Sequence, residues 1–145
     1  MSAIKRLIRV NNYLRDFAAS GRKAVIVTRQ NDAVTKLARK SGDQIVVARP
    51  EMSSSGDVDS LDSNITLAFF ALAKIDGPGL TEQIEEDTYA RLAELCGGIL
   101  TKFMDDITGG ECPALCGLDL SSVDIVPESG IFGGWCGYSI EIVLE

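Results

Sequence analysis

The stretch "NITLAFFALAKI", residues Asn64 to Ile75, decides the fold of this chain. Alternate positions from Ile65 to Ile75 are apolar, and the positions between them are also apolar in the middle of the segment. A strand that is apolar on both faces must be covered on both sides. The segment therefore predicts a central strand of a sheet that carries helices.

Helices and further strands are predicted before and after this segment. Helical spacing of apolar residues predicts a long helix over residues 2–20, a short helix after Asp32 and a second long helix that Thr81 caps. Gly97 and Gly98 inside this last helix predict a kink or a close crossing of backbones. The other predicted strands are β-branched or alternating, and they are 23–29, 43–50, 118–127 and 134–145. Because strands follow one another without strict alternation with helices, we predict an α+β fold. It has a mostly antiparallel sheet of about five strands, with two longer helices and one short helix packed on it.

The chain has the size of one domain, and we expect residues 1–145 to share a single core. Within it, residues 51–63 are small, polar and acidic, which predicts a flexible acidic loop. The longest uncharged apolar stretch, 65–73, is far shorter than the roughly 20 residues that span a bilayer, so no membrane span is predicted. The N-terminal sequence lacks the continuous apolar centre of a signal peptide, which favours an intracellular protein.

Charge is distributed unevenly along the chain. Residues 1–50 carry a net charge of +8, and residues 51–145 carry −15. The excess of acid argues against binding to nucleic acid, because it repels a phosphate backbone. The split favours a basic patch on one molecule that meets an acidic patch on another, including a second copy of the chain. The alternative is that folding interleaves the two halves and the charges cancel locally.

The residues that most often carry catalysis are missing or poorly spaced. The sequence holds no histidine, which removes Ser-His and Cys-His pairs and the commonest zinc ligand. Cys112 and Cys116 are four positions apart, unlike the closer pairs of zinc knuckles and redox dithiols. We therefore predict no enzymatic activity, no catalytic residues, no metal and no cofactor. A zinc or thiol protein that also uses Cys96 and Cys136 stays open as an alternative.

Four glycines crowd the segment "GIFGGWCG", residues 130–137. A phosphate-binding glycine turn leads into a helix, whereas this segment leads into a predicted strand. We interpret Gly133 and Gly134 as a turn with positive φ, and Gly137 as a bulge or a close approach of another backbone. The glycines thus indicate a hairpin and not a nucleotide site.

Candidate interface residues come from the two charged regions and from one aromatic residue. Trp135 is predicted on the face of the last strand opposite Tyr138 and Ile140, and it is a candidate interface anchor if that face is exposed. The alternative is that a helix covers it. The candidates from the N-terminal helix, the acidic segment and the last strand are Lys5, Arg6, Arg9, Arg15, Asp57, Asp59, Asp62 and Trp135.

Three segments together resemble a known group of proteins. They are "DSNITLAFFALAKID", "TEQIEEDTYARLAELCGGILTKFMDD" and the closing "LDLSSVDIVPESGIFGGWCGYSIEIVLE". Over residues 60–145 the sequence is similar to that of small phage and prophage virion proteins of the tail-completion or tail-terminator kind. The first 60 residues resemble these proteins only in the order of their predicted helices and strands. The segment "GGECPALCG" departs from the usual pattern of that group.

This resemblance implies a virion structural protein without catalysis. It implies a homo-oligomeric ring, typically of six copies, at the end of the tail that meets the head, with tail-tube and head-tail connector proteins as partners. The expected location is the virion, assembled in the cytoplasm of a bacterial host. The resemblance also implies that basic and acidic surfaces meet between neighbouring copies. A cytosolic ligand-binding or regulatory α+β module remains an alternative.

Overall fold

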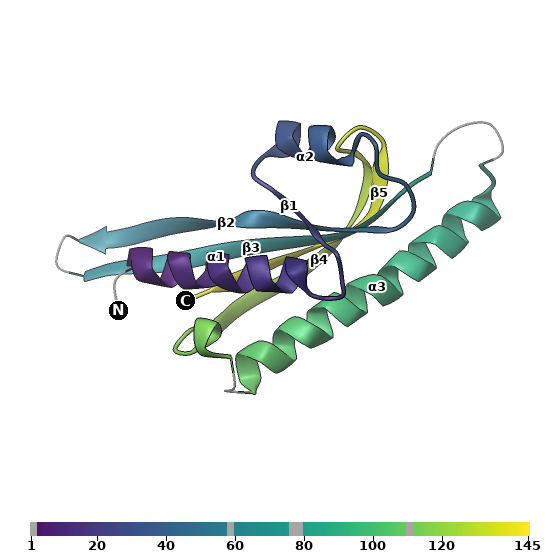
Figure 1. The fold of residues 1–145 in the computed structure, drawn as a ribbon. Coiled ribbons are helices and arrows are strands. Elements are labelled where there is room, and N and C mark those ends of the chain that lie inside the picture. Colours follow the sequence, from purple (N-terminus) through teal and green to yellow (C-terminus); the bar gives the residue numbers. More distant parts are fainter. Residues whose placement is uncertain (1–2, 58–59, 76–79, 110–111) are drawn as a thin grey trace.

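The computed structural model describes residues 3–57, 60–75, 80–109 and 112–145. Three α-helices, one 3₁₀ turn (η1) and five strands are found in these residues (Figure 1). In chain order they are α1 (Ala3–Ala19), β1 (Val25–Val27), α2 (Gln30–Leu37), β2 (Gln44–Asp57), β3 (Ser60–Lys74), α3 (Glu82–Thr108), η1 (Pro113–Leu115), β4 (Leu120–Ile131) and β5 (Trp135–Leu144).

The five strands form one sheet in the order β1-β2-β3-β5-β4. β1 pairs with β2 in parallel, and all other neighbours are antiparallel. The helices α1 and α3 lie on one face of the sheet, and α2 lies on the other face near one end (Figure 1). The predicted α+β fold with a mostly antiparallel sheet of about five strands is confirmed.

The central strand is β3, as the two apolar faces of residues 64–75 predicted. Ile65, Leu67 and Phe69 point into the larger core, which they share with α1 and α3. Leu72 points to the opposite face and joins a smaller core under α2. One strand therefore contributes to both cores, because successive side chains point to opposite faces of a sheet.

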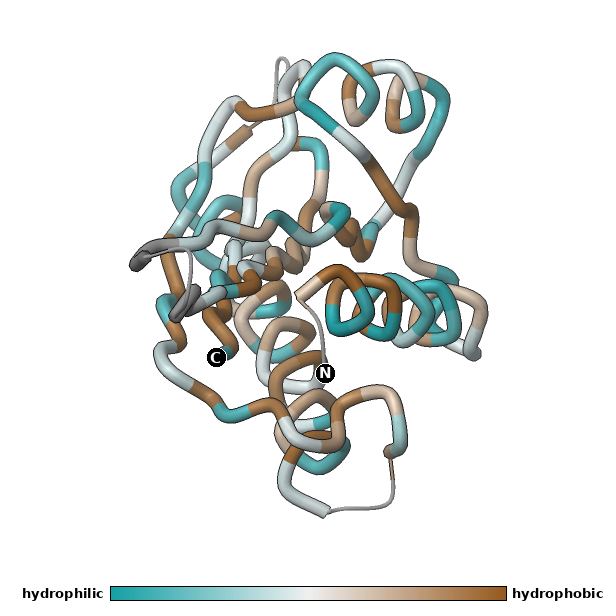
Figure 2. The backbone as a smooth tube through the Cα atoms, turned by 90° about the vertical axis from the view of Figure 1, so that its left-hand side faces the viewer, coloured by the Kyte–Doolittle hydropathy of each residue, from teal (hydrophilic) through white to brown (hydrophobic). Residues whose placement is uncertain are grey.

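The larger core is built around four aromatic rings. Phe69 of β3 lies 5.1 Å from Phe17 of α1 and 6.0 Å from Phe103 of α3, measured between ring centroids. Tyr13 of α1 also lies 6.0 Å from Phe103, in an edge-on arrangement. These contacts hold α1, α3 and the sheet together, because aromatic rings bury large apolar areas. Figure 2 shows hydrophobic and hydrophilic residues alternating along both long helices.

The prediction of a flexible loop at residues 51–63 is wrong for the residues that the structure describes. β2 continues to Asp57, and β3 already begins at Ser60, so the two strands form a long hairpin. Its pairs run from Glu51 opposite Thr66 to Asp57 opposite Ser60. The low strand propensity of serine and aspartate is overridden because the neighbouring strand satisfies the backbone hydrogen bonds.

Side chains also stabilise this hairpin. The hydroxyl groups of Ser54 and Ser63 lie 3.2 Å apart across the strands and form a hydrogen bond. Met52 is half-buried against the larger core, opposite Ile65. The polar composition of this segment therefore does not reflect a lack of secondary structure in the described residues.

Helix α3 is unbroken over 27 residues. Thr81 caps its start as predicted, because the hydroxyl oxygen accepts a hydrogen bond of 3.2 Å from the backbone N–H of Ile84. Gly97 and Gly98 lie on its exposed side, and a Cβ atom added at either position would meet nothing within 4 Å. The predicted close crossing of backbones at these glycines is therefore wrong within the described chain.

Replacing Gly97 and Gly98 by alanine is expected to stabilise the protein. Each substitution removes unfolded-chain entropy and adds no clash, so the free energy of unfolding should rise by about 0.5–1 kcal/mol per site. Urea denaturation of Gly97→Ala, Gly98→Ala and the double variant measures this. A loss of stability in either single variant would show that the glycine side of α3 is already in contact with another surface.

Candidate functional site

The glycine segment forms the turn between β4 and β5. Gly133 and Gly134 have φ values of 90° and 106°, and the N–H of Gly134 donates to the carbonyl of Ile131. The turn leads directly into β5. The interpretation of these residues as a hairpin turn is confirmed, and the segment offers no helix N-terminus to a phosphate.

Gly137 is the place where another backbone comes close, as predicted. Its φ is 148°, and a Cβ atom added there would overlap the carbonyl oxygen of Ala71 and lie 3.0 Å from Leu92. Ala71 belongs to β3 and Leu92 to α3. Gly137 therefore allows β5, β3 and α3 to approach one another closely.

The interpretation of Trp135 as an exposed interface anchor is wrong for this protomer. Its side chain is only 1% exposed, and it packs in the smaller core with Leu37, Val46 and Leu72. Lys74 of β3 places its ammonium group 5.9 Å from the centre of the indole ring. The physical reason is that α2 covers this end of the sheet, which is the alternative considered for this residue.

The four predicted basic residues of α1 divide into two kinds. Lys5 and Arg15 are exposed, whereas Arg6 and Arg9 are half-buried. The guanidinium group of Arg9 donates hydrogen bonds to the backbone carbonyls of Pro113 and Cys116. Arg9 therefore ties η1 and its following residue to α1, and it has a structural role inside the protomer.

The three predicted acidic residues all fall in or near the β2–β3 hairpin. Asp57 ends β2, and Asp62 lies on β3 opposite Ser55. Asp59 lies outside the described residues. Because they belong to a hairpin, Asp57 and Asp62 are held at the far end of paired strands.

Folding keeps most of the basic and acidic halves of the chain apart. The basic residues 1–50 form α1, β1, α2 and the first part of β2, at one edge of the sheet. The acidic remainder supplies α3, β5 and the opposite edge strand β4 (Figure 1). The ion pair between Arg91 and Asp43 joins the halves, whereas Lys36–Asp32 and Lys102–Asp106 each lie within one half. The basic and acidic halves of the chain therefore supply opposite edges of the sheet, and β3 of the acidic half lies between them.

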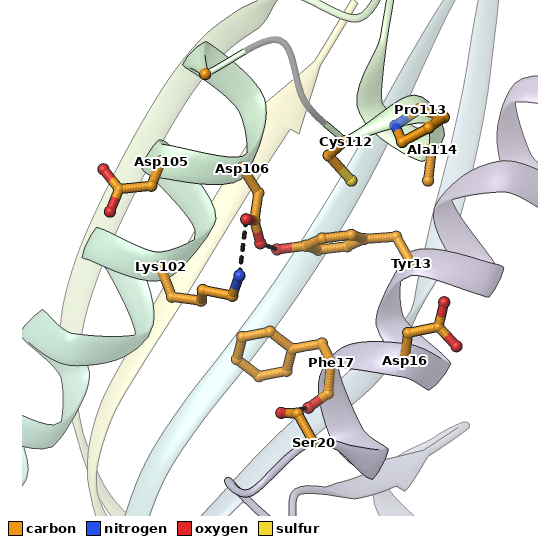
Figure 3. A pocket seen from close by; sticks show the side chains of 11 residues that line it. Tyr13, Asp16, Phe17, Ser20, Lys102, Asp105, Asp106, Cys112, Pro113 and Ala114 are labelled. Atoms are coloured by element: carbon orange, nitrogen blue, oxygen red, sulfur yellow. Dashed lines mark hydrogen bonds and ion pairs between the residues drawn. The ribbon is translucent and has the colours of Figure 1, made fainter.

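A pocket of about 720 Å³ opens between α1, the end of α3 and η1. Tyr13 and Phe17 reach into it from α1, and Lys102 and Asp106 reach it from α3 (Figure 3). The Tyr13 hydroxyl donates a hydrogen bond of 2.6 Å to one carboxylate oxygen of Asp106, and the Lys102 ammonium lies 2.8 Å from the other. The pocket thus combines aromatic walls with a carboxylate that already has two partners.

Burial is the main cause that raises the pKa of Tyr13 well above its ordinary value, and the hydrogen bond to the Asp106 carboxylate adds to it. The hydroxyl therefore stays protonated in the folded protein at pH values where a free tyrosine ionises. Such a group holds the Asp106 side chain in place and is a poor proton acceptor or nucleophile. The arrangement is typical of a structural hydrogen bond.

Replacing Tyr13 by phenylalanine is expected to lower the free energy of unfolding by about 1–2 kcal/mol at pH 7, because a hydrogen bond to a charged group is lost. Above about pH 10 the unfolded tyrosine loses its proton while the folded one keeps it, so wild-type stability falls as pH rises. The variant lacks this contribution. Urea melts from pH 8 to 11 measure both effects, and parallel curves for the two proteins would contradict the assignment.

The four cysteines are all free thiols in the structure. Cys96 and Cys136 are buried, and their burial raises the pKa of both thiols. A raised pKa leaves little thiolate at neutral pH, and the thiolate is the reactive form. Cys112 is half-buried beside the pocket and Cys116 is exposed. In the described parts of the chain, no three His, Cys, Asp or Glu side chains lie together as metal ligands would.

The sequence did not indicate the Tyr13–Asp106–Lys102 cluster. Tyr13 and Asp106 are separated by 93 positions, and neither is among the candidate residues that the sequence indicated. The only local signal is the spacing of four between Lys102 and Asp106, which is common on helix surfaces. Only the packing of α1 against α3 brings the three residues together.

Comparisons with known proteins do not assign this chain to a class. No family model matches the chain, and no curated protein and no solved structure matches it significantly. None of the helices in the described residues combines the length and the apolar character needed to cross a bilayer.

Proposed function

We propose that this protein is a non-enzymatic virion assembly protein of the tail-terminator or tail-completion type. It forms a homo-oligomeric ring, with six copies as the expected number, at the end of a phage or prophage tail that meets the head. Its partners are other copies of itself, tail-tube proteins and head-tail connector proteins, and it is assembled in the cytoplasm of a bacterial host.

The observation that carries this proposal is the separation of charge between the two edges of the sheet. A ring is closed by head-to-tail contacts, which join two different patches of the same molecule. The basic helix α1 and the acidic strands β4 and β5 at the other edge of the sheet provide two such patches. Complementary charges on two patches also favour the correct orientation of encounter.

The resemblance of residues 60–145 to tail-terminator proteins supplies the biological setting of the proposal. The lack of histidine and the raised pKa of the two buried thiols favour a role without catalysis. Hairpins that project from a folded body, such as β2–β3, suit contacts with a further assembly partner (Figure 1).

The test is the mass of the particle in solution. Size-exclusion chromatography with light scattering, at several protein concentrations and at low and high salt, is expected to show a closed oligomer that weakens as salt screens the contacts. Negative-stain microscopy is expected to show rings. A protein that stays monomeric at every concentration and salt level would contradict the ring.

The pocket at Tyr13 favours one second candidate, a ligand-binding module. Its volume of about 720 Å³ lies within the range of small-molecule sites, and it combines aromatic walls with charged groups. A rise in the melting temperature with a cationic aromatic compound would favour this candidate. A screen without any such rise would leave the assembly role as the better account.

A further inference from the structure

We propose that the exposed face of α1 in one copy docks on the open part of the sheet in the next copy. The inference rests on the ring assembly proposed above and names the two surfaces that meet in it. The basic α1 surface consists of Ile4, Lys5, Ile8 and Arg15. The acidic sheet surface consists of Ala68, Asp124, Val126, Glu141 and Val143.

The basic α1 surface lies opposite the side of the helix that packs on the core. Ile4 and Ile8 are one helical turn apart and are 56% and 53% exposed. Arg15 follows Ile8 by seven residues, so it lies on the same face, and it is exposed. Two exposed isoleucines at helical spacing beside basic side chains form a stripe that the core of this protomer does not use.

The acidic sheet surface lies on the face that α2 covers only at one end. Of the helices in the described residues, α2 alone lies on this face, over the end that holds Trp135 (Figure 1). Farther along, Val126 of β4 is 47% exposed, and Ala68 and Val143 are half-buried. These small and β-branched residues form an apolar surface on the sheet against which a helix can pack.

The acidic sheet surface also carries an unfavourable charge pair. Asp124 of β4 lies directly opposite Glu141 of β5, and both side chains are exposed. Like charges at directly opposite positions destabilise a sheet. A basic side chain from another molecule relieves this repulsion, and α1 presents Arg15 beside the isoleucines.

The two surfaces therefore complement each other in both charge and apolar character. They are different surfaces of one chain, so their contact is head-to-tail and can be repeated around a ring. A second copy is the favoured occupant because this chain itself supplies both surfaces, and the basic apolar one matches the acidic apolar one.

The experiment uses two variants of the full chain. The first, Ile8→Ser with Arg15→Ser, removes the apolar and basic character of α1 at two exposed positions. The second, Asp124→Lys with Glu141→Lys, reverses the charge of the sheet surface. Each variant alone is expected to need roughly tenfold or more protein to assemble than wild type does, measured by light scattering. Mixed together, they are expected to form a two-copy complex through the one intact pair of surfaces.

Matched controls place the same kinds of change elsewhere. Val34→Ser with Arg39→Ser alters α2 and the turn that follows it, and Glu86→Lys with Glu94→Lys reverses two exposed charges on α3. Both controls are expected to assemble like wild type. Thermal melts of all four variants show whether each one is folded.

The outcomes separate this contact from the ring itself. If wild type assembles and both surface variants assemble equally well, the contact is wrong and the ring proposal stands. If the two variants do not combine when mixed, the head-to-tail pairing of these surfaces is overturned. If wild type is monomeric and instead sediments with phosphatidylserine vesicles, both the contact and the ring are overturned.

Discussion

Replacing Trp135 by alanine is expected to lower the free energy of unfolding by about 3–5 kcal/mol, because a buried indole ring leaves a large cavity. The side chain is only 1% exposed and fills the space between α2, β2 and β3. A loss of this size is a large share of the stability of a domain of this length. Urea denaturation at low protein concentration, monitored by circular dichroism, measures the change.

Two further variants test whether this loss of stability comes from the role of Trp135 in the core. Trp135→Phe keeps most of the apolar volume and is expected to cost clearly less than Trp135→Ala. Val126→Ala, on the exposed part of the same sheet face, is expected to change stability by no more than about 0.5 kcal/mol. If Trp135→Ala instead left the monomer as stable as wild type and only weakened assembly, the residue would be an interface anchor after all.

The second large effect is expected at Gly137. Replacing it by alanine is expected to cost about 3 kcal/mol or more, because a strained backbone and an overlapping atom each cost about 1–3 kcal/mol. The added Cβ overlaps the carbonyl oxygen of Ala71, which is backbone and cannot turn aside. Relief requires β5 to move away from β3, in the middle of the sheet.

Control glycines separate the two contributions to this loss. Gly130 and Gly117 also have positive φ values, of 67° and 82°, but an added Cβ atom meets nothing within 4 Å at either position. Alanine at these positions is expected to cost only about 1–2 kcal/mol, from backbone strain alone. Equal losses at Gly137 and Gly130, measured by the same urea denaturation, would show that the close approach of Ala71 contributes nothing.

The elements of this fold could be predicted wherever a local pattern was strong. Helix α1, helix α3 with its Thr81 cap and the central strand β3 each show a clear period of apolar residues. The hairpin at residues 51–63 could not be predicted, because serine and aspartate favour loops when they are judged without their neighbours. Only the pairing of β2 with β3 satisfies the backbone there.

The candidate site was predictable in composition but not in arrangement. The separation of basic and acidic residues can be counted in the sequence, yet the sequence alone left open whether folding interleaves them. The strand order decided this, since it places β1 and β4 at opposite edges of the sheet. The role of Trp135 and the cluster at Tyr13 also depended on which helix covers which face.

The sequence by itself therefore determined the fold class, the central strand and the glycine turn, because periodicity and backbone preference are local properties. The tertiary structure alone decided which surfaces remain exposed. Ile8 and Trp135 illustrate the difference: both are large and apolar, but Ile8 is 53% exposed and Trp135 is 1% exposed. Which segment covers a given face depends on the packing of distant parts of the chain, and a local pattern of residues does not specify it.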